Sequence, residues 1–558
     1  MNSLIKISIL FFTFLSSLTT TILAQDLMEV QYNYRDIRAI EKRHEIQTIE
    51  NKTTKIRVVL EKENKNLLVS LITIDKKTNK LTTNRLSGYY HLKTAHYIEG
   101  NLKYNFEKVI EDYQGNFWVL SSVYSPKSQK LYRRSFDTNT GKLGTNILMC
   151  EREIHDYAGR AVKYKGTYFS NVNYHFVQSK NKQFFSIVTY FSNAKLKNTK
   201  MMIDIIDKNF DNYWSTTTTL NTFNDQAYYQ NHDPYKSPFE FKDILITGNG
   251  IIFAMHKVYN SDKRKDKFYI LKAFKKGEKE PITHYIRHDE KNIHDLSITI
   301  NNSNNVLVSG FYNTKKKYKS EKIEGLYFLN INSDEMSMIT ESYTPFNRDQ
   351  LKSFWIPSVH PFGDQKKFKS IVKNATYNFD HNEDFVLDNY YYTLKLIPHE
   401  NNSFSLVSET IIPPLVAENL QIININEFGK INWIKCFRKK NITKKEARLE
   451  KLAYSSTISS LYHKPHSSVF EILDHVVMIY REDKKVILGI VNSNGETQFD
   501  LIYDNEIKND LSKYRIYPGE ITLASYNSLM GIAFYNQKEV KDEKVKILDY
   551  KFNLKNPQ

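Results

Sequence analysis

Three histidines in the stretch "HYIRHDEKNIH" have the spacing of a possible metal site: His284, His288 and His294. On a helix, residues four apart lie side by side, with about 6 Å between Cβ atoms, and two such imidazoles can share one zinc ion. On a strand, four residues span roughly 13 Å, which is too far for two nitrogens that must each lie about 2 Å from the metal. Metal binding therefore depends on the local secondary structure.

The surrounding sequence favours strands. "PITHYIRH" is predicted as the last strand of one unit, "DEKN" as a linker and "DLSITI" as the next first strand. The metzincin proteases, whose histidine spacing is the same, also need Glu directly after the first histidine and Gly before the last turn. This chain has Tyr285 and Lys291 at those positions. A metzincin-type site is excluded, and no cofactor or metal is expected.

Two weaker clusters give no better site. The histidines of "HKPH" (463–466) are expected in a surface turn, because Pro465 disfavours a helix. "DHNEDFVLD" (380–388) alternates oxygen-bearing side chains as a calcium loop does, but Phe385 and Tyr391 stand where such a loop needs Gly and Glu. Two interpretations stay open for it, a calcium site and an acidic hairpin tip.

The first 24 residues have the organisation of a secretory signal peptide, with Lys6 before an apolar core and a cleavage site after Ala24. The mature chain from Gln25 to Gln558 is expected to be secreted or periplasmic, monomeric, and one large domain. No transmembrane anchor is expected, because no later segment approaches the roughly 18 uninterrupted apolar residues that a spanning helix needs.

The chain is basic, with a formal net charge of +17 at pH 7. Such a balance favours acidic partners, namely polyanionic glycans, a lipid head-group surface or nucleic acid; the alternative is that the lysines only keep the protein soluble. The two cysteines, Cys150 and Cys436, are too few for a thiolate metal site. They are expected as separate buried thiols, with a disulfide as the alternative.

Four segments of seven residues, rich in β-branched and aromatic residues, each end in tyrosine: "WVLSSVY" (118–124), "FFSIVTY" (184–190), "FAMHKVY" (253–259) and "VLVSGFY" (306–312). Each is followed by a polar turn with lysines and a second apolar run, which predicts a repeated β-hairpin. Looser copies, one of them ending at Tyr377, give a mean period of roughly 58 residues, near that of propeller repeats. The best helical signal lies at 34–50.

Turn signals on both sides of each hairpin extend the unit to four strands. "EDYQGNFWVL" (111–120) resembles the short D-x-x-G-N-x-W repeat of propellers in bacterial sensor proteins, with Asp112, Gly115, Asn116 and Trp118 matching. The resemblance implies a fold and no activity. We therefore predict an all-β fold, a β-propeller of seven or eight blades of four antiparallel strands. Two smaller β-domains or a sandwich array are the alternatives.

Lysines recur in the predicted turn between the second and third strands. Equivalent turns of a propeller emerge on one face, so these residues would form a basic crown: Lys127, Lys130, Lys195, Lys197, Lys263, Arg264, Lys265, Lys315, Lys316 and Lys317. The alternative is that they are solvated tips that prevent pairing between sheet edges.

Ligands of propellers generally meet the linkers between the last strand of one blade and the first strand of the next. Candidates on these linkers are Lys242 with Asp243, and His294 with Asp295. An insert at 343–365 adds Trp355 and His360. Its aromatic residues are expected to plug the channel of the propeller; they could also cover a neighbouring blade or stack on sugar rings.

The sequence thus predicts an exported, non-catalytic binding or scaffold protein whose basic face engages an acidic glycan or an envelope partner. The alternative is a propeller-type glycan hydrolase or lyase with carboxylates such as Asp243 and Asp295, which would need a separation of about 5 to 10 Å. Nucleic acid is not expected as a partner, because no recognised nucleic-acid-binding module is present.

Overall fold

The computed structural model describes the chain from residue 28 to residue 554 with gaps, the longest of which are 154–161, 222–238, 440–466, 505–513 and 536–544. The predicted signal peptide and the "HKPH" histidines lie outside the described residues. The chain divides into two compact units, Lys42–His463 and a smaller one made of Met1–Glu41 and Lys464–Gln558. The expectation of a single domain stays a prediction.

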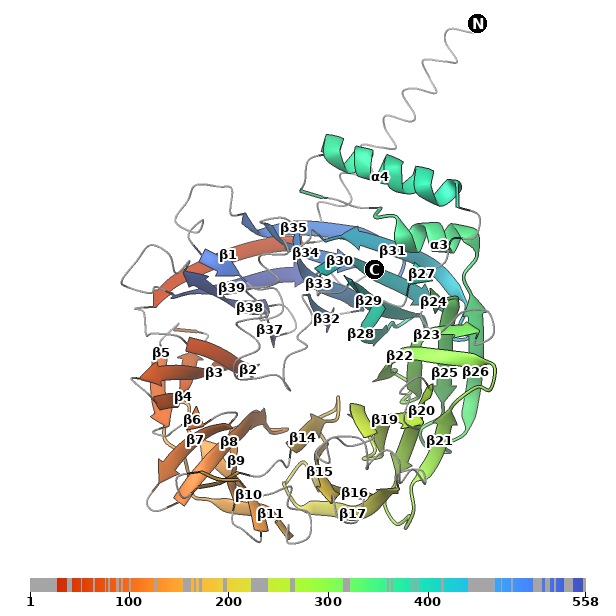
Figure 1. Ribbon diagram of the computed structural model, residues 1–558. Coiled ribbons are helices and arrows are strands. Elements are labelled where there is room, and N and C mark those ends of the chain that lie inside the picture. The colour runs from red at the N-terminus through yellow and green to blue at the C-terminus, as the bar shows by residue number, and fades with distance from the viewer. Residues whose placement is uncertain are drawn as a thin grey trace, which may run out of the picture. The chain divides into compact units, whose positions relative to one another are not determined.

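The fold is a β-propeller (Figure 1), as predicted, and the described residues form seven blades of four antiparallel strands that follow one another in sequence. Six blades belong to the larger unit. The first three of them are β2 (Arg43–Glu50), β3 (Thr54–Glu63), β4 (Asn66–Asp75) and β5 (Leu81–Leu86); β8 (Leu102–Glu111), β9 (Phe117–Tyr124), β10 (Ser128–Phe136) and β11 (Ile147–Glu153), extended by β7 (Thr94–Glu99) and β6 (Tyr90–His91); and β14 (Asn173–Gln178), β15 (Phe184–Asn193), β16 (Asn198–Asp207) and β17 (Asn212–Asn221).

Blades 4 to 6 complete the larger unit. Their strands are β18 (Phe239–Ile246), β19 (Ile252–Asn260), β20 (Asp266–Phe274) and β21 (Ile282–Ile286); β22 (Lys291–Ile300), β23 (Val306–Thr314), β25 (Gly325–Ile331) and β26 (Met338–Pro345); and β28 (Tyr391–Pro398), β29 (Phe404–Ile412), β30 (Val416–Ile425) and β31 (Ile431–Arg438). The larger unit also contains two short pairs of strands. β12 (Val162–Tyr164) pairs with β13 (Thr167–Phe169) between blades 2 and 3 of the chain, and β24 (Lys322–Ile323) of blade 5 pairs with β27 (Leu387–Asp388).

The smaller unit contains blade 7 and a sheet built from both ends of the described chain. Blade 7 consists of β32 (Ser468–Ile472), β33 (His475–Glu482), β34 (Lys485–Val491) and β35 (Thr497–Asp504). In the other sheet β1 (Met28–Ile37) pairs with β39 (Val545–Leu554), which pairs in turn with β38 (Ser528–Tyr535). The short strands β36 (Tyr514–Ile516) and β37 (Thr522–Ser525) also pair with β38.

The four tyrosine-ended segments are the second strands β9, β15, β19 and β23, as predicted. The middle strands of a blade are covered on both faces, which explains their continuous apolar runs. In blade 5 all of β25 and nearly all of β23 is buried, whereas the last strand β26 has no fully buried residue.

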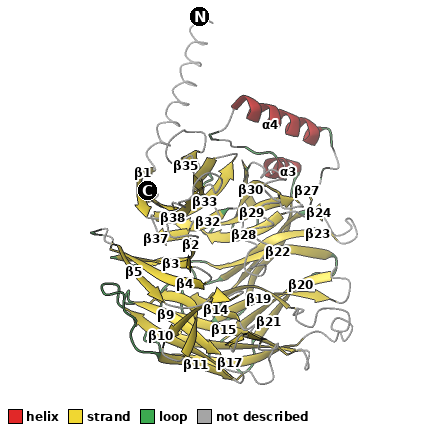
Figure 2. Cartoon of the chain, turned by 60° about the vertical axis from the view of Figure 1, so that its left-hand side comes forward, coloured by secondary structure: helices red, strands yellow, loops and turns green. Residues whose placement is uncertain are grey.

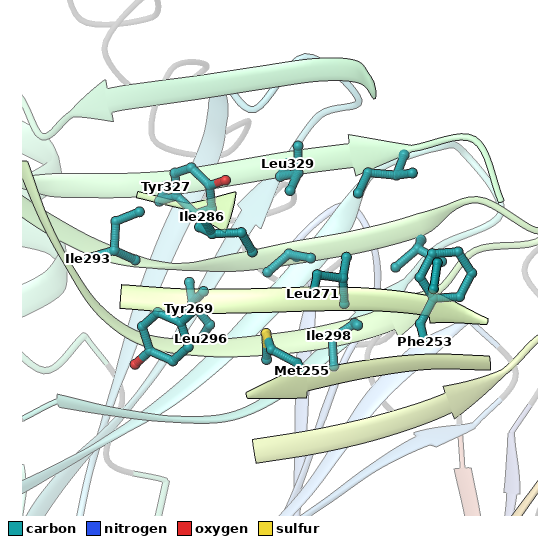
Figure 3. Packing of buried hydrophobic residues seen from close by; sticks show 14 of the residues in the cluster. Phe253, Met255, Tyr269, Leu271, Ile286, Ile293, Leu296, Ile298, Tyr327 and Leu329 are labelled. Carbon is teal, nitrogen blue, oxygen red and sulfur yellow. The ribbon is translucent and has the colours of Figure 1, made fainter. Parts of the chain in front are cut away.

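Neighbouring blades of the larger unit pack face to face through apolar clusters. Figure 3 shows the cluster between blades 4 and 5, where Phe253, Met255 and Leu271 of one blade meet Leu296, Ile298 and Leu329 of the next. Because these side chains are almost fully buried, they hold the two sheets together mainly by the hydrophobic effect.

The turn at Asp112 shows how the blade hairpins end. Asp112 Oδ1 accepts the main-chain N–H groups of Gln114 and Asn116, and its Oδ2 accepts Trp118 Nε1 at 2.9 Å. Gly115 has φ +89°, a left-handed conformation that other residues adopt at a cost. The short polar motif thus closes the turn between β8 and β9, and its tryptophan locks that turn to the following strand.

First strands of five blades contain a β-bulge, where one residue has no opposite partner. The unpaired residues are Ile46 in β2, Glu107 in β8, Lys242 in β18, Asp295 in β22 and Leu394 in β28. A bulge bends the strand and re-aims the neighbouring side chains. The unpaired residues lie five or six positions before the residue that begins the hairpin turn, so the bulges are a feature of the repeat.

Two predictions of secondary structure were wrong. Of the segment with the best helical signal, 34–50, residues 34–37 belong to strand β1 and residues 43–50 to strand β2. Tyr377 does not end a repeat strand but lies in α4 (Gln365–Asp380), which with α3 (Arg348–Trp355) makes two helices that were not predicted (Figure 2). The calcium-loop-like segment therefore starts at the end of a helix, and it is not a hairpin tip.

The insert covers a blade, and its described residues do not plug a channel. Phe354 of α3 is fully buried in an apolar cluster with Phe311 of blade 5 and Tyr391 of blade 6. The main-chain N–H of Ser358 bonds the carbonyl oxygen of Cys436 in β31 at 2.9 Å. Packing against two blades fixes α3, because its aromatic side chains fill the space beside the sheets.

Candidate functional site

A pocket of about 330 Å³ lies where the first strands of blades 2, 3 and 4 meet. Its lining comes from β8, β14 and β18: Glu107, Lys108, Tyr174, His175, Phe176, Val177, Asp243 and Ile244. The volume is at the lower end of the range that ligand sites occupy, about 300 to 1,000 Å³. The pocket is therefore large enough for one small ring or one residue of a polymer.

The repeat itself assembles this pocket. Lys108, His175 and Asp243 are each the fourth residue before the residue that begins the hairpin turn, namely Asp112, Ser179 and Thr247. Because the blades are repeats of one unit, equal positions in the three first strands lie at equal height. A cation, an imidazole and a carboxylate are thus brought together by strands far apart in the sequence.

Lys108 is the cation of the pocket. Its Nζ lies 3.4 Å from the carbonyl oxygen of Phe176, a long hydrogen bond across two blades. Burial lowers the pKa of Lys108, because the ammonium loses hydration. Within the described part of the chain no carboxylate pairs with this ammonium, so its charge is only weakly compensated.

His175 is half-buried, and behind it His256 of β19 is almost fully buried. Burial lowers the pKa of His175 to about 4. Burial, with the charges of Lys272 and His175, lowers the pKa of His256 to about 3. Both imidazoles are therefore neutral at neutral pH, and His175 offers the pocket an uncharged ring that can donate or accept a hydrogen bond.

Two carboxylates border the same pocket. Glu107 accepts a hydrogen bond from the hydroxyl of Ser122, and Asp243 Oδ1 accepts the N–H of Ile244 at 2.8 Å. A carboxylate has about four acceptor positions, so both groups can also accept ligand hydroxyls. Tyr174 stacks on Phe176 with ring centroids 5.5 Å apart, and it adds an aromatic wall.

The predicted linker residues lie within strands. Lys242 and Asp243 belong to β18, and His294 and Asp295 belong to β22. Of these only Asp243 lines the pocket. His294 is buried, 2 % exposed, and Asp295 Oδ2 accepts both the N–H and the hydroxyl of Thr393 in blade 6, at 2.7 and 2.9 Å. Strands β18 and β22 begin before these residues, so the expected linker positions are part of the sheets.

The remaining predicted residues are not brought together. Trp355 ends α3 and packs against Phe385, while His360 lies outside the described residues. Lys130 of the basic crown lies in β10 and forms an ion pair with Glu151 of β11 at 3.3 Å. The other crown residues lie outside the described residues, so the crown stays a prediction.

Of the eight residues that line the pocket, the sequence predicted only Asp243; the other polar side chains, Glu107, Lys108, Tyr174 and His175, were missed. The signal was present, because aligning the first strands on their turn residues puts Lys108 and His175 level with Asp243. Our alignment used the second strands, which carry the tyrosines but do not reach the pocket.

His284 lies in strand β21, as predicted, whereas His288, predicted in the same strand, lies in the following linker, and His294 lies in β22, which begins earlier than predicted. Among the described side chains, no group of three or more His, Cys, Asp or Glu is placed to hold a metal ion. Both cysteines are free thiols. In the ranges that the structure covers, no helix is long and apolar enough to cross a membrane.

No family model matches the chain, and no curated protein matches it. Solved structures similar to it include the polysaccharide lyase Uly1, with 8% identity, TM-score 0.36, and coverage of 92% of this chain and 100% of that one. A PL25 ulvan lyase bound to -[GlcA(1-4)Rha3S]- follows, with 11% identity, TM-score 0.34, and coverage of 79% and 93%. The β-propeller domain of the trilobed protease from Pyrococcus furiosus has 8% identity, TM-score 0.34, and coverage of 83% and 94%. Identities and TM-scores this low carry no information about the activity of the present chain.

Proposed function

We propose that the protein is an exported, non-catalytic binding protein for an acidic glycan, and that one acidic sugar residue of the glycan occupies the pocket between β8, β14 and β18. The observation that carries the proposal is Lys108, a half-buried ammonium in a pocket without a carboxylate partner in the described chain. An unpaired charge away from water is costly, and a carboxylate or sulfate on the ligand would compensate it.

The rest of the lining fits a sugar ring. Glu107 and Asp243 can accept ring hydroxyls, neutral His175 can donate to one, and the stacked Tyr174 and Phe176 present apolar ring surface. The net charge of the chain, +17, would attract a polyanion to the protein before the pocket selects a residue of it.

The test is calorimetric titration with oligogalacturonate and with a neutral cello-oligosaccharide. Lys108→Met keeps the side-chain length and removes the charge, and we expect it to weaken oligogalacturonate binding about tenfold to a hundredfold. Lys130→Met, at a predicted crown position, is the matched control and should change the affinity less than about threefold. Equal losses for both variants, or equal binding of the neutral oligosaccharide, would reject the pocket.

A second candidate function, glycan hydrolysis or elimination, is favoured by one observation: Glu107 and Asp243 border the same pocket. Paired carboxylates can act as acid and base on a glycosidic bond. The measurement is release of new chain ends from the acidic glycan. If the wild type releases chain ends and both Glu107→Gln and Asp243→Asn do not, the protein is an enzyme and the proposal of a non-catalytic role is wrong. If the wild type releases none, this function is excluded for that glycan.

A further inference from the structure

Helix α4 carries a cluster of four exposed lysines, which we call the α4 lysine face: Lys366, Lys367, Lys369 and Lys373. The opposite side of the helix consists of buried or half-buried residues at positions 368, 371, 372, 375, 376 and 379. That spacing is one helical stripe, so the apolar side of α4 is already packed within the protein. What the helix presents outward is charge.

The charge pattern of α4 works against the stability of the helix. All four lysines lie in its first nine residues and its first turn has no acidic residue, although the helix dipole favours anions at that end. Lysines at spacings of three and four, such as Lys366 with Lys369 and Lys369 with Lys373, also repel each other. The neighbouring helix α3 has the arrangement of charges that the helix dipole favours, with Asp349 in its first turn and Lys352 in its last.

The neighbouring helix neutralises the one acid of α4 and fixes the helix in place. Lys352 of α3 forms an ion pair with Asp380 at 3.1 Å. Arg348 of α3 donates to the carbonyl oxygens of Phe379 and Asn382 at the end of α4, at 2.8 and 3.2 Å. These contacts fix the helix that carries the lysine side chains.

From this arrangement we infer that the α4 lysine face docks the protein on an anionic phospholipid surface. Figures 1 and 2 both show α3 between α4 and the strands of blade 6, so α4 does not pack directly on that sheet. The exposed lysines lie along one helix and are spread over its first nine residues. Such a row of cations can contact several head groups of a flat lipid surface at once, whereas a single polyanion chain is usually held in a groove, as proposed for the pocket of blades 2 to 4.

The docking is electrostatic and does not insert the helix. Phe368 and Phe379 are buried within the protein and unavailable to lipid. Tyr377, 60% exposed on the same outward side as Lys373, is the one large apolar contact that α4 offers to a head-group layer. Binding should therefore need acidic lipid and weaken steeply with salt.

The test is co-sedimentation of the full-length protein with phosphatidylglycerol–phosphatidylcholine vesicles and with phosphatidylcholine vesicles. The variant Lys366→Gln/Lys367→Gln/Lys369→Gln/Lys373→Gln should bind the acidic vesicles about a hundredfold or more weakly, since each lysine near an anionic surface strengthens binding several-fold. The matched control replaces four exposed lysines from turns between third and fourth strands of four blades: Lys77→Gln, Lys142→Gln, Lys279→Gln and Lys430→Gln. It should retain most of the binding.

Three results would overturn the inference. The wild type could bind acidic and neutral vesicles equally well, or the two quadruple variants could lose equal amounts of vesicle binding. The third is a quadruple α4 variant that no longer binds soluble oligogalacturonate but still binds the acidic vesicles. The double variant Lys369→Gln/Lys373→Gln should bind the acidic vesicles about tenfold more weakly. It replaces the quadruple variant in the test if circular dichroism shows that the quadruple variant is unfolded. Lys108→Met should bind vesicles like the wild type, so this inference and the proposed function can fail separately.

Discussion

The first strands of blades 4 and 5 each carry an aspartate at the bulge, and the two carboxylates have different surroundings. Asp295 is itself the unpaired residue, whereas Asp243 follows the unpaired Lys242. Asp295 in β22 accepts two hydrogen bonds from Thr393 of the next blade, whereas Asp243 in β18 lines the pocket. The opposite strands differ as well. In β23, Phe311 and Gly310 face the bulge, and in β19 the same places hold His256 and Met255. Adjacent positions of the same bulge thus serve to join blades in one case and to form a cavity in the other, and the surrounding side chains decide which.

The largest expected effect is the response of the blade 4 bulge to acid. His175 and His256 have folded-state pKa values of about 4 and about 3, below the roughly 6.5 of an unfolded chain. The protein is therefore most stable above about pH 6.5, the pKa of these histidines in the unfolded chain. Stability is lost as the pH falls below that value, because the unfolded chain then binds protons at both histidines and the folded chain does not. When the pH is lowered from about 8 to about 5, the two histidines together should lower the free energy of unfolding by about 4 kcal/mol.

Urea unfolding of the full chain across this pH range measures the loss. His256→Gln should remove about half of the pH dependence, whatever its effect on stability at pH 8. Phe311→Leu, the matched change in blade 5, should leave the slope against pH as in the wild type. An unchanged slope in His256→Gln would show that this histidine does not make the blade 4 bulge acid-sensitive.

The packing of the blade 5 bulge should be broken by Gly310→Ala. A Cβ at Gly310 would lie 2.0 Å from the carbonyl oxygen of Asp295 and 2.7 Å from Leu296 Cδ2, so the strands must separate. We expect a loss of about 3 kcal/mol, at the upper end of typical overpacking costs. Gly277→Ala, at an open turn with φ +85° and no atom within 4 Å of the added carbon, should cost only about 1 kcal/mol.

The hydrogen bonds of the blade 5 bulge give a smaller effect. Asp295→Ala leaves the N–H of Thr393 without its acceptor, and we expect a loss of about 2 kcal/mol in urea unfolding. Thr393→Val removes only the hydroxyl donor and should cost about 1 kcal/mol. If Asp295→Ala is as stable as the wild type, the aspartate does not join blades 5 and 6.

The smallest change in stability is expected at the other aspartate. Asp243→Asn keeps the side-chain shape and the acceptor for Ile244, so unfolding should change by less than about 0.5 kcal/mol. Its effect should appear in oligogalacturonate affinity, where loss of a charged acceptor weakens binding severalfold. A large loss of stability, with affinity unchanged, would make Asp243 a second structural aspartate and end the contrast.

The fold was accessible from the sequence because its signals are local. Runs such as "VLVSGFY" predict a strand by themselves, and the glycine and asparagine turns mark where it ends. Helix α4 also has a local signal, the stripe that includes Phe368 and Phe379, and it was missed because the repeat had been extended to Tyr377. The spacing of these apolar residues would by itself have predicted a helix.

The pocket was not accessible in the same way. Lys108, His175 and Asp243 come from three blades, and only the relative heights of three first strands bring them together. Each bulge shifts the following residues by one place, which decides whether a side chain faces the pocket or the next sheet. Asp295 shows the same limit, since its partner Thr393 is supplied by another blade.

The pairing of β1 with β39 sets an order on biosynthesis. A ribosome produces β1 long before β39, so the earliest strand of the described chain has no neighbour on that side until translation is almost complete. During that interval it offers an open backbone edge to any other extended segment, and chaperones or rapid export would have to shield it.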